Sequence, residues 1–150
     1  MIKILGCILI LSASICACVF YESSEKSKLN AIKEINDFIK HIRSQIEYFC
    51  TPLDKIYTEF EHKTEIISCL ANKGALAIKD YLDATDFELI NTLFSELGKS
   101  VKSEQIALCS YTSKELEESF EKKKSELPNK IKAFRAIALF CGFCAVILII

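Results

Sequence analysis

The C-terminal stretch of this chain constrains its fold more than any other. Residues 136–150 read AIALFCGFCAVILII without a charged side chain, and Lys132 and Arg135 stand just before them. A helix that begins near Ile131, with these basic side chains reaching up to lipid headgroups, is about 30 Å long at ~1.5 Å per residue. That length matches the hydrocarbon core of a bilayer. A buried helix of a soluble core rarely stays apolar on every face, so we expect residues 131–150 to form a transmembrane helix.

The N-terminal end is also apolar, and three interpretations compete for it. Residues 1–21 read MIKILGCILILSASICACVFY and carry no charge from Ile4 to Tyr21. A secretory signal peptide needs an apolar stretch of about 7–15 residues before a small-residue cleavage site. A lipoprotein would be lipidated at Cys18, after a poor lipobox. A retained transmembrane helix needs about 18 apolar residues, and this run has them.

Charge favours the retained helix and orients it. The far side of the first helix offers only Lys3 and the amino terminus, whereas the middle segment has many basic residues near the two apolar ends: Lys26, Lys28, Lys33, Lys40, Lys122, Lys123, Lys124, Lys130, Lys132 and Arg135. The positive-inside rule then puts the middle in the cytoplasm and both termini outside. We expect a transmembrane helix at 1–21, a cytoplasmic bundle at 22–130 and a second transmembrane helix at 131–150. The alternative is an exported helical surface protein, anchored by its signal or by a lipid.

The middle segment predicts an all-α bundle without strand alternation. Its first helix carries an apolar stripe in steps of three and four: Leu29, Ile32, Ile35, Ile39, Ile42, Ile46 and Phe49. Thr51 and Pro52 suit the cap and first position of a second helix, Thr85 and Glu88 have capping-box spacing, and Gly98 ends the helix that follows. The helices expected after the first cover residues 52–61, 64–72, 75–84, 85–97 and 102 onward, and Pro128 kinks or restarts the last.

The sequence gives little support to a catalytic site. Cys50, Cys69 and Cys109 are widely spaced and have no neighbouring histidine, so structural thiols are favoured over nucleophiles. The two histidines, His41 and His62, lie in polar helical contexts without ligands at metal spacing. A net charge of -1 gives no argument for nucleic-acid binding. We expect no enzymatic activity, no metal, no cofactor and no small-molecule substrate.

Two segments of the middle resemble a known family. The run from Ile46 to Leu53 is similar to the E-x-Y-x-x-T-P-L segment of the stage III sporulation protein AB family, and Leu97-Gly98-Lys99-Ser100 with Gln105 is similar to its L-G-x-S-D-x-x-x-Q segment. Residues 134–150 resemble the final, glycine-containing span of that family. The segments occur in the order and at the spacing found in that family, and the resemblance covers essentially the whole chain.

The resemblance implies a membrane component of the assembly that links mother cell and forespore. Its middle part would be a helical bundle like the cytoplasmic domains of the type II secretion platform protein. By that analogy it would sit in the mother-cell membrane facing the forespore, dock a secretion-type ATPase and contact other membrane proteins of the stage III complex. The residues that carry the resemblance are the candidate interaction or structural motif: Glu47, Tyr48, Thr51, Pro52, Leu53, Gly98, Ser100 and Gln105.

Seven of these eight residues divide into two groups. Thr51, Pro52 and Gly98 are explained as helix caps, because proline and glycine usually serve backbone geometry. Four polar residues are instead expected to contact a partner or a neighbouring helix: Glu47, Tyr48, Ser100 and Gln105. If Glu47 is buried it needs a polar partner, which Tyr48 or Gln105 could supply. Replacing Glu47 or Gln105 should weaken complex assembly more than it destabilises the bundle.

Overall fold

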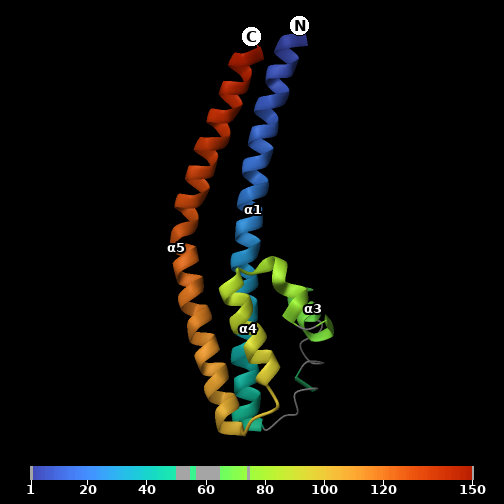
Figure 1. The fold of residues 1–150 in the computed structure, drawn as a ribbon, viewed down its shortest axis with the longest axis vertical. Helices are drawn as coiled ribbons and strands as arrows, with labels where there is room; N and C mark the ends of the chain where they lie inside the picture. Colours follow the sequence, from blue (N-terminus) through green and yellow to red (C-terminus); the bar gives the residue numbers. More distant parts are fainter. Residues whose placement is uncertain (1, 50–54, 57–64, 74, 150) are drawn as a thin grey trace. The chain divides into compact units, whose positions relative to one another are not determined.

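The computed structural model describes residues 2–49, 55–56, 65–73 and 75–149. Helices make up the described elements, as predicted, and none of these residues forms a strand. In chain order they are α1 (Ile2–Ser44), the π-helical η1 (Gln45–Phe49), α3 (Glu65–Lys73), the 3₁₀-helical η2 (Ala75–Tyr81), α4 (Ala84–Glu96) and α5 (Lys102–Ile149) (Figure 1). The chain divides into two compact units: an end unit of Met1–Ser27 with Lys123–Ile150, and a central unit of Lys28–Lys122.

The central unit is built on the predicted isoleucine stripe. Its core residues from α1 are Ile32, Ile35, Ile39 and Ile42, all essentially without exposed surface, and Ile46 of η1 continues the row. Phe38 is also fully buried and stacks on Phe94 of α4, with ring centroids 6.4 Å apart. Helix α4 adds Ile90 and Leu93, and α5 adds Cys109 and Leu116. Fully burying one such aliphatic side chain contributes about 1.5–3 kcal/mol, so the stripe and the residues that α4 and α5 pack against it together stabilise the central unit.

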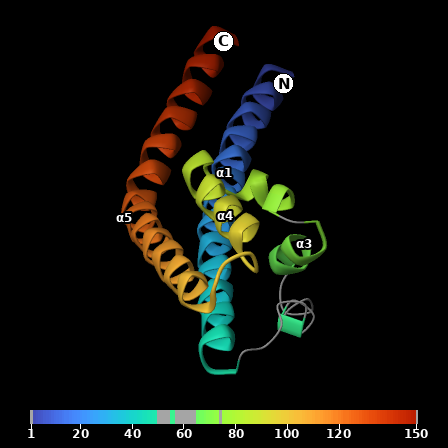
Figure 2. The ribbon, with the colours of Figure 1, turned by 60° about the horizontal axis from the view of Figure 1, so that its bottom comes forward.

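Polar contacts between helices fix how the central unit is assembled. The Ser113 hydroxyl of α5 donates to Oδ1 of Asn36 in α1 at 2.7 Å, and both residues are buried. The Ser119 hydroxyl donates to the Asp86 carboxylate of α4, at 2.9 and 3.2 Å from its two oxygens. If α5 slid along α1 or α4, these buried groups would lose their hydrogen-bond partners, which is costly in an apolar core. They therefore set the register of α5 against α1 and α4, which pack together in the central unit (Figure 2).

The turn between α4 and α5 is closed by Gly98, as the sequence predicts. Gly98 has a φ of 86°, a left-handed conformation that costs other residues energy. The amide of Leu97 donates to the carbonyl of Leu93 at 2.9 Å, and the amide of Lys99 donates to that of Glu96 at 3.1 Å. These bonds satisfy carbonyl groups at the end of α4 and turn the chain toward α5.

Residues 75–84 differ from the α-helix that we expected. Residues 75–81 wind as the 3₁₀ helix η2, which has three residues per turn and so presents a different face. Ile78 is fully buried, whereas Leu76 and Tyr81 are exposed. The predicted capping box is also wrong, because α4 begins at Ala84 with Asp83 as its N-cap and no side-chain cap bond. The helix expected at 52–61 lies mostly outside the described residues.

Helices α1 and α5 pass from one unit to the other without interruption. The polar stretch at 22–28, directly after the apolar N-terminal run, is fully helical. Pro128 lies inside α5, so a restart there is wrong. A proline removes one backbone hydrogen bond from a helix, and the turns on both sides hold α5 together.

The end unit consists of the first part of α1 and the last part of α5, side by side, with both termini at one end (Figure 1). Tyr21 stacks on Phe134 with ring centroids 4.1 Å apart and planes 11° from parallel. Large apolar side chains face outward from both helices, among them Ile8, Ile15, Phe20, Phe140, Phe143 and Ile147. Among the described residues one helix, Ile8–Phe49, is long and apolar enough to cross a membrane, while a second span at 131–150 stays a prediction.

Candidate partner-binding site

One end of the central unit brings together the two segments that carry the family resemblance. The Lys102 ammonium donates to the backbone carbonyl of Glu47 at 2.8 Å, across 55 positions of sequence. This bond joins η1, at the end of α1, to the first turn of α5. The segment around Glu47 and Tyr48 therefore lies against the segment that runs from Gly98 to Gln105.

Glu47 is half-buried and its carboxylate pairs with Arg43, one turn earlier in the chain. The distance between Oε2 of Glu47 and Nε of Arg43 is 3.6 Å. Tyr48 and Gln105 were the partners considered from the sequence, and the structure pairs Glu47 with Arg43 instead. Because the pair is largely solvated, it contributes little to stability, and the carboxylate remains accessible for a second contact.

Gln105 serves the turn in which it lies. The side-chain Nε2 of Gln105 donates to the backbone carbonyl of Ser100 at 2.6 Å. The backbone amide of Gln105 donates to the carbonyl of Val101 at 3.1 Å. The amide of Glu104 donates to the same Val101 carbonyl. Gln105 thus braces the loop that Gly98 opens, and Ser100 takes part through its backbone.

Three apolar side chains at this end are exposed to solvent. Tyr48 and Phe49 of η1 are 72% and 70% exposed, and Val101 at the start of α5 is 63% exposed. Phe49 was expected to close the buried stripe. A π-helical turn holds more residues than an α-helical one, and η1 turns Tyr48 and Phe49 away from the core face that Ile46 still occupies. We call Glu47, Tyr48, Phe49, Val101 and Lys102 the tip surface.

The remaining predicted residues, Thr51, Pro52 and Leu53, lie outside the described residues. Sequence analysis missed Phe49, Val101 and Lys102 as members of the tip surface. Phe49 was assigned to the core by its spacing alone, and the π turn gives no sequence signal. Lys102 occupies an unspecified position inside the second family motif, so the motif gave no signal for it.

Two described groups of the central unit that could carry chemistry are the thiol of Cys109 and the carboxylate of Asp86. Burial raises the pKa of the Cys109 thiol to about 11, and the positive charge of Arg43 only partly offsets this. Cys109 is therefore a protonated thiol that packs as an apolar group. A polar hollow of about 480 Å³ lies between α4 and α5, where Asp86 is already bonded to Ser119. Over the described residues, no group of three His, Cys, Asp or Glu side chains is placed to hold a metal ion.

Comparison with known proteins decides the family. A family model described as stage III sporulation protein AB matches residues 3–150, nearly the whole chain. The chain belongs to the stage III sporulation protein AB family. No curated protein and no solved structure matches it. The family predicted from the two motifs is confirmed, and this member of the stage III sporulation protein AB family has those motifs joined at the tip surface.

Proposed function

We propose that this protein is a non-enzymatic scaffold of the channel complex that forms between mother cell and forespore. The end unit anchors it in the mother-cell membrane by two spans, and the central unit stands in the cytoplasm. The tip surface docks a secretion-type ATPase, and the complex includes other membrane proteins of stage III. Family membership supports the sporulation role, and the analogy to a secretion platform supports the docking role.

Membrane anchoring is supported by where the apolar side chains lie. In the end unit they face outward from both helices, in contrast to the isoleucine stripe of the central unit, which faces inward. Water disfavours such an exposed apolar surface, whereas lipid accepts it. The basic residues that flank the two apolar ends favour the cytoplasmic side for the central unit.

The single observation that carries the docking proposal is the bond between Lys102 and the Glu47 carbonyl. It makes one surface out of two family motifs, and that surface exposes Tyr48 and Phe49. Exposed aromatic residues with charged neighbours are typical of the few positions that dominate binding at protein interfaces. Neither aromatic residue contributes to the core, so stability alone does not explain this arrangement.

The test is co-purification of the full-length chain, in detergent micelles, with the secretion-type ATPase of the same sporulation system. Tyr48→Ala combined with Phe49→Ala should weaken binding at least tenfold, as expected when two central contacts are truncated. The matched control is Tyr111→Ala, because Tyr111 is also exposed but lies further along α5. Equal binding by the double variant and the control would refute docking through the tip surface.

Glu47 and Gln105 give a second, finer test. Glu47→Gln keeps the size of the side chain and removes the charge that reaches solvent, so it should weaken ATPase binding while thermal stability changes little. Gln105→Ala should lower both, since Gln105 braces the turn at Ser100. Loss of stability equal to loss of binding in Glu47→Gln would show that Glu47 is structural.

A further inference from the structure

An apolar groove lies between the two helices of the end unit. It encloses about 200 Å³ and is lined by Ile15, Cys18 and Val19 from α1 and by Arg135 and Leu139 from α5. Four of these five described side chains are uncharged and apolar in character, and the fifth is the charged Arg135. This volume is smaller than that of pockets that enclose a drug-sized ligand, and it suits part of one flexible hydrocarbon chain.

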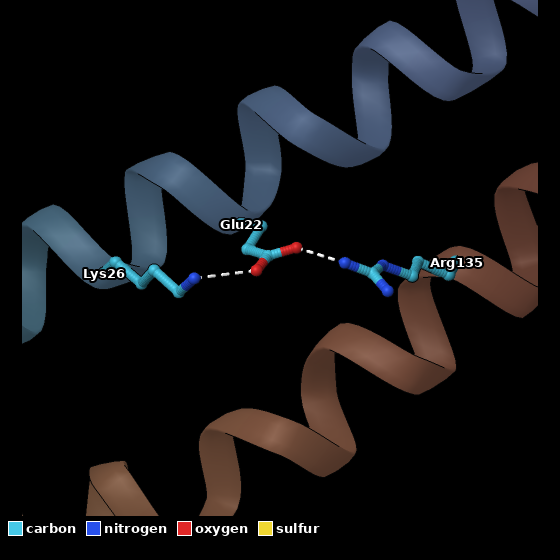
Figure 3. Close-up of polar contacts among 3 residues, drawn as sticks. All are labelled: Glu22, Lys26 and Arg135. Atoms are coloured by element: carbon cyan, nitrogen blue, oxygen red, sulfur yellow. Dashed lines mark hydrogen bonds and ion pairs between the residues drawn. The ribbon is translucent and has the colours of Figure 1, made fainter.

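Arg135 belongs to a charged cluster at the polar end of this groove, drawn in Figure 3. The Glu22 carboxylate accepts hydrogen bonds from Lys26, at 2.8 Å, and from Arg135. These two hydrogen bonds lower the pKa of Glu22, the bond from Lys26 more than the bond from Arg135, so the carboxylate is ionised at neutral pH. Two cations and one anion leave the cluster with a net positive charge.

The two cations still have donors to offer a ligand. An ammonium carries three N–H groups and a guanidinium five, and the side chains of Lys26 and Arg135 are 59% and 54% exposed. Arginine is suited to bidentate contacts with a phosphate. The stacked rings of Tyr21 and Phe134 lie beside the cluster in sequence, and aromatic residues favour the headgroup level of a membrane.

We propose that this groove binds one anionic phospholipid. The phosphate bonds to Arg135 and Lys26, and the first part of one acyl chain lies against Ile15, Val19 and Leu139. Charge complementarity selects the anionic headgroup, and the apolar lining selects a lipid over free phosphate. The site rests on the proposed insertion of the end unit into a membrane, because the groove contacts lipid only if that unit is inserted.

Native mass spectrometry of the full-length chain in detergent micelles tests the site. The chain is incubated with dioleoyl phosphatidylglycerol or with dioleoyl phosphatidylcholine, which has the same acyl chains and no net charge. We expect one phosphatidylglycerol to be retained, and about tenfold less of it in Arg135→Gln, given the strength of hydrogen bonds to charged groups. The matched control is Lys132→Gln, which removes the same charge from α5 at a residue that does not line the groove.

A second variant distinguishes two roles of Arg135: binding a lipid, or only joining the two helices through its ion pair with Glu22. Glu22→Gln breaks the same ion pair as Arg135→Gln but raises the positive charge of the cluster, so it should retain phosphatidylglycerol at least as well as the native chain. Equal losses in both variants would reduce Arg135 to a structural partner of Glu22. Equal retention of the two lipids, or binding of inorganic phosphate but of neither lipid in a parallel incubation, would also refute the site.

Extraction of membranes with alkaline carbonate distinguishes this failure from failure of the proposed function. Release of the chain from the membranes would end both proposals. A chain that resists extraction but does not discriminate between the two lipids would end the lipid site alone.

Discussion

The two units of this protein use apolar residues in opposite ways, although α1 and α5 contribute to both. In the central unit Ile32, Ile35, Ile39 and Ile42 have essentially no exposed surface. In the end unit residues of the same kind, such as Ile8, Ile15 and Ile147, are mostly exposed. A stripe that covers one face of a helix produces a core in water, whereas apolar residues on all faces require an apolar surrounding. Along α1 and α5 the apolar side chains therefore change from buried positions in the central unit to exposed positions in the end unit, which is what the proposed insertion of the end unit into lipid requires.

Polar groups show the same contrast. The central unit buries Asn36, Asp86 and Ser113, and hydrogen bonds between helices satisfy them. In the end unit Ser12 and Ser14 donate to carbonyls of their own helix. Helices in the central unit are therefore tied to one another by polar contacts at defined positions. The end unit makes its inter-helix polar contact at Glu22 and Arg135.

The largest expected difference between the units comes from truncating an apolar side chain. Phe38→Ala should lower the free energy of unfolding by about 3–5 kcal/mol, because Phe38 is fully buried against Phe94. Ile15→Ala in the end unit should change it by less than about 0.5 kcal/mol. Urea unfolding of the full chain in detergent micelles measures both. Similar costs at the two sites would break the comparison.

A buried hydrogen bond gives the next effect. Asn36→Ala leaves the Ser113 hydroxyl buried without its acceptor and should cost about 1–3 kcal/mol. The double variant Asn36→Ala, Ser113→Ala should cost less than the sum of the single variants, since it removes both groups. Ser14→Ala is the control in the end unit and should change the same unfolding free energy little. A purely additive double variant would show that the pair is not coupled.

Two glycines should respond with opposite signs. Gly98→Ala should destabilise the central unit by about 1–2 kcal/mol, because its φ of 86° is unfavourable for a residue with a side chain. Gly6→Ala should stabilise the N-terminal part of α1 by about 0.5–1 kcal/mol, and an added Cβ there meets nothing within 4 Å. Thermal unfolding followed by circular dichroism compares them. A stabilising Gly98→Ala would contradict the left-handed turn.

The last effect depends on pH and comes from the buried thiol of Cys109. In the folded chain the pKa of Cys109 is about 11, raised from 9.0 by burial, so above pH 9 the unfolded state loses this proton first. Stability should therefore fall between pH 9 and 11, by at most about 1.4 kcal/mol per pH unit. The Cys109→Ala variant should lack this part of the decline when both proteins are unfolded in urea across that range. Identical pH profiles would show that the thiol is not buried as described.

Much of the fold could be predicted from the sequence because its apolar residues recur clearly at the spacing of an α-helix. The isoleucine stripe, the helix at 64–72, the helix at 85–97 and the stop at Gly98 all follow from spacing and cap chemistry, and the structure confirms them within one residue. In a segment that is not α-helical, the α-helical spacing of apolar residues no longer shows which side chains face the core. That is why Phe49, on a π segment, was wrongly placed in the core, and why the 3₁₀ segment at 75–81 was expected to be α-helical.

The polar contacts of the core could not be predicted because they depend on pairs far apart in sequence. Asn36 lies on the stripe face, but nothing local indicates Ser113 as its partner, 77 positions away. The same holds for Lys102 and Glu47, whose contact creates the tip surface. The segment with Glu47 and the segment with Gly98 and Gln105 were recognised together by their order and spacing in the sequence, but their contact in space comes from tertiary packing.

Accessibility of an engineered cysteine tests most directly that the central unit is cytoplasmic and carried by membrane spans. Ser103→Cys, at an exposed position of the central unit, is placed in a full-length chain whose own cysteines are changed to alanine. A membrane-impermeant maleimide is applied to intact cells and again after permeabilisation. We predict no labelling until the membrane is opened. Labelling in intact cells would put the central unit outside and rule out docking of an ATPase.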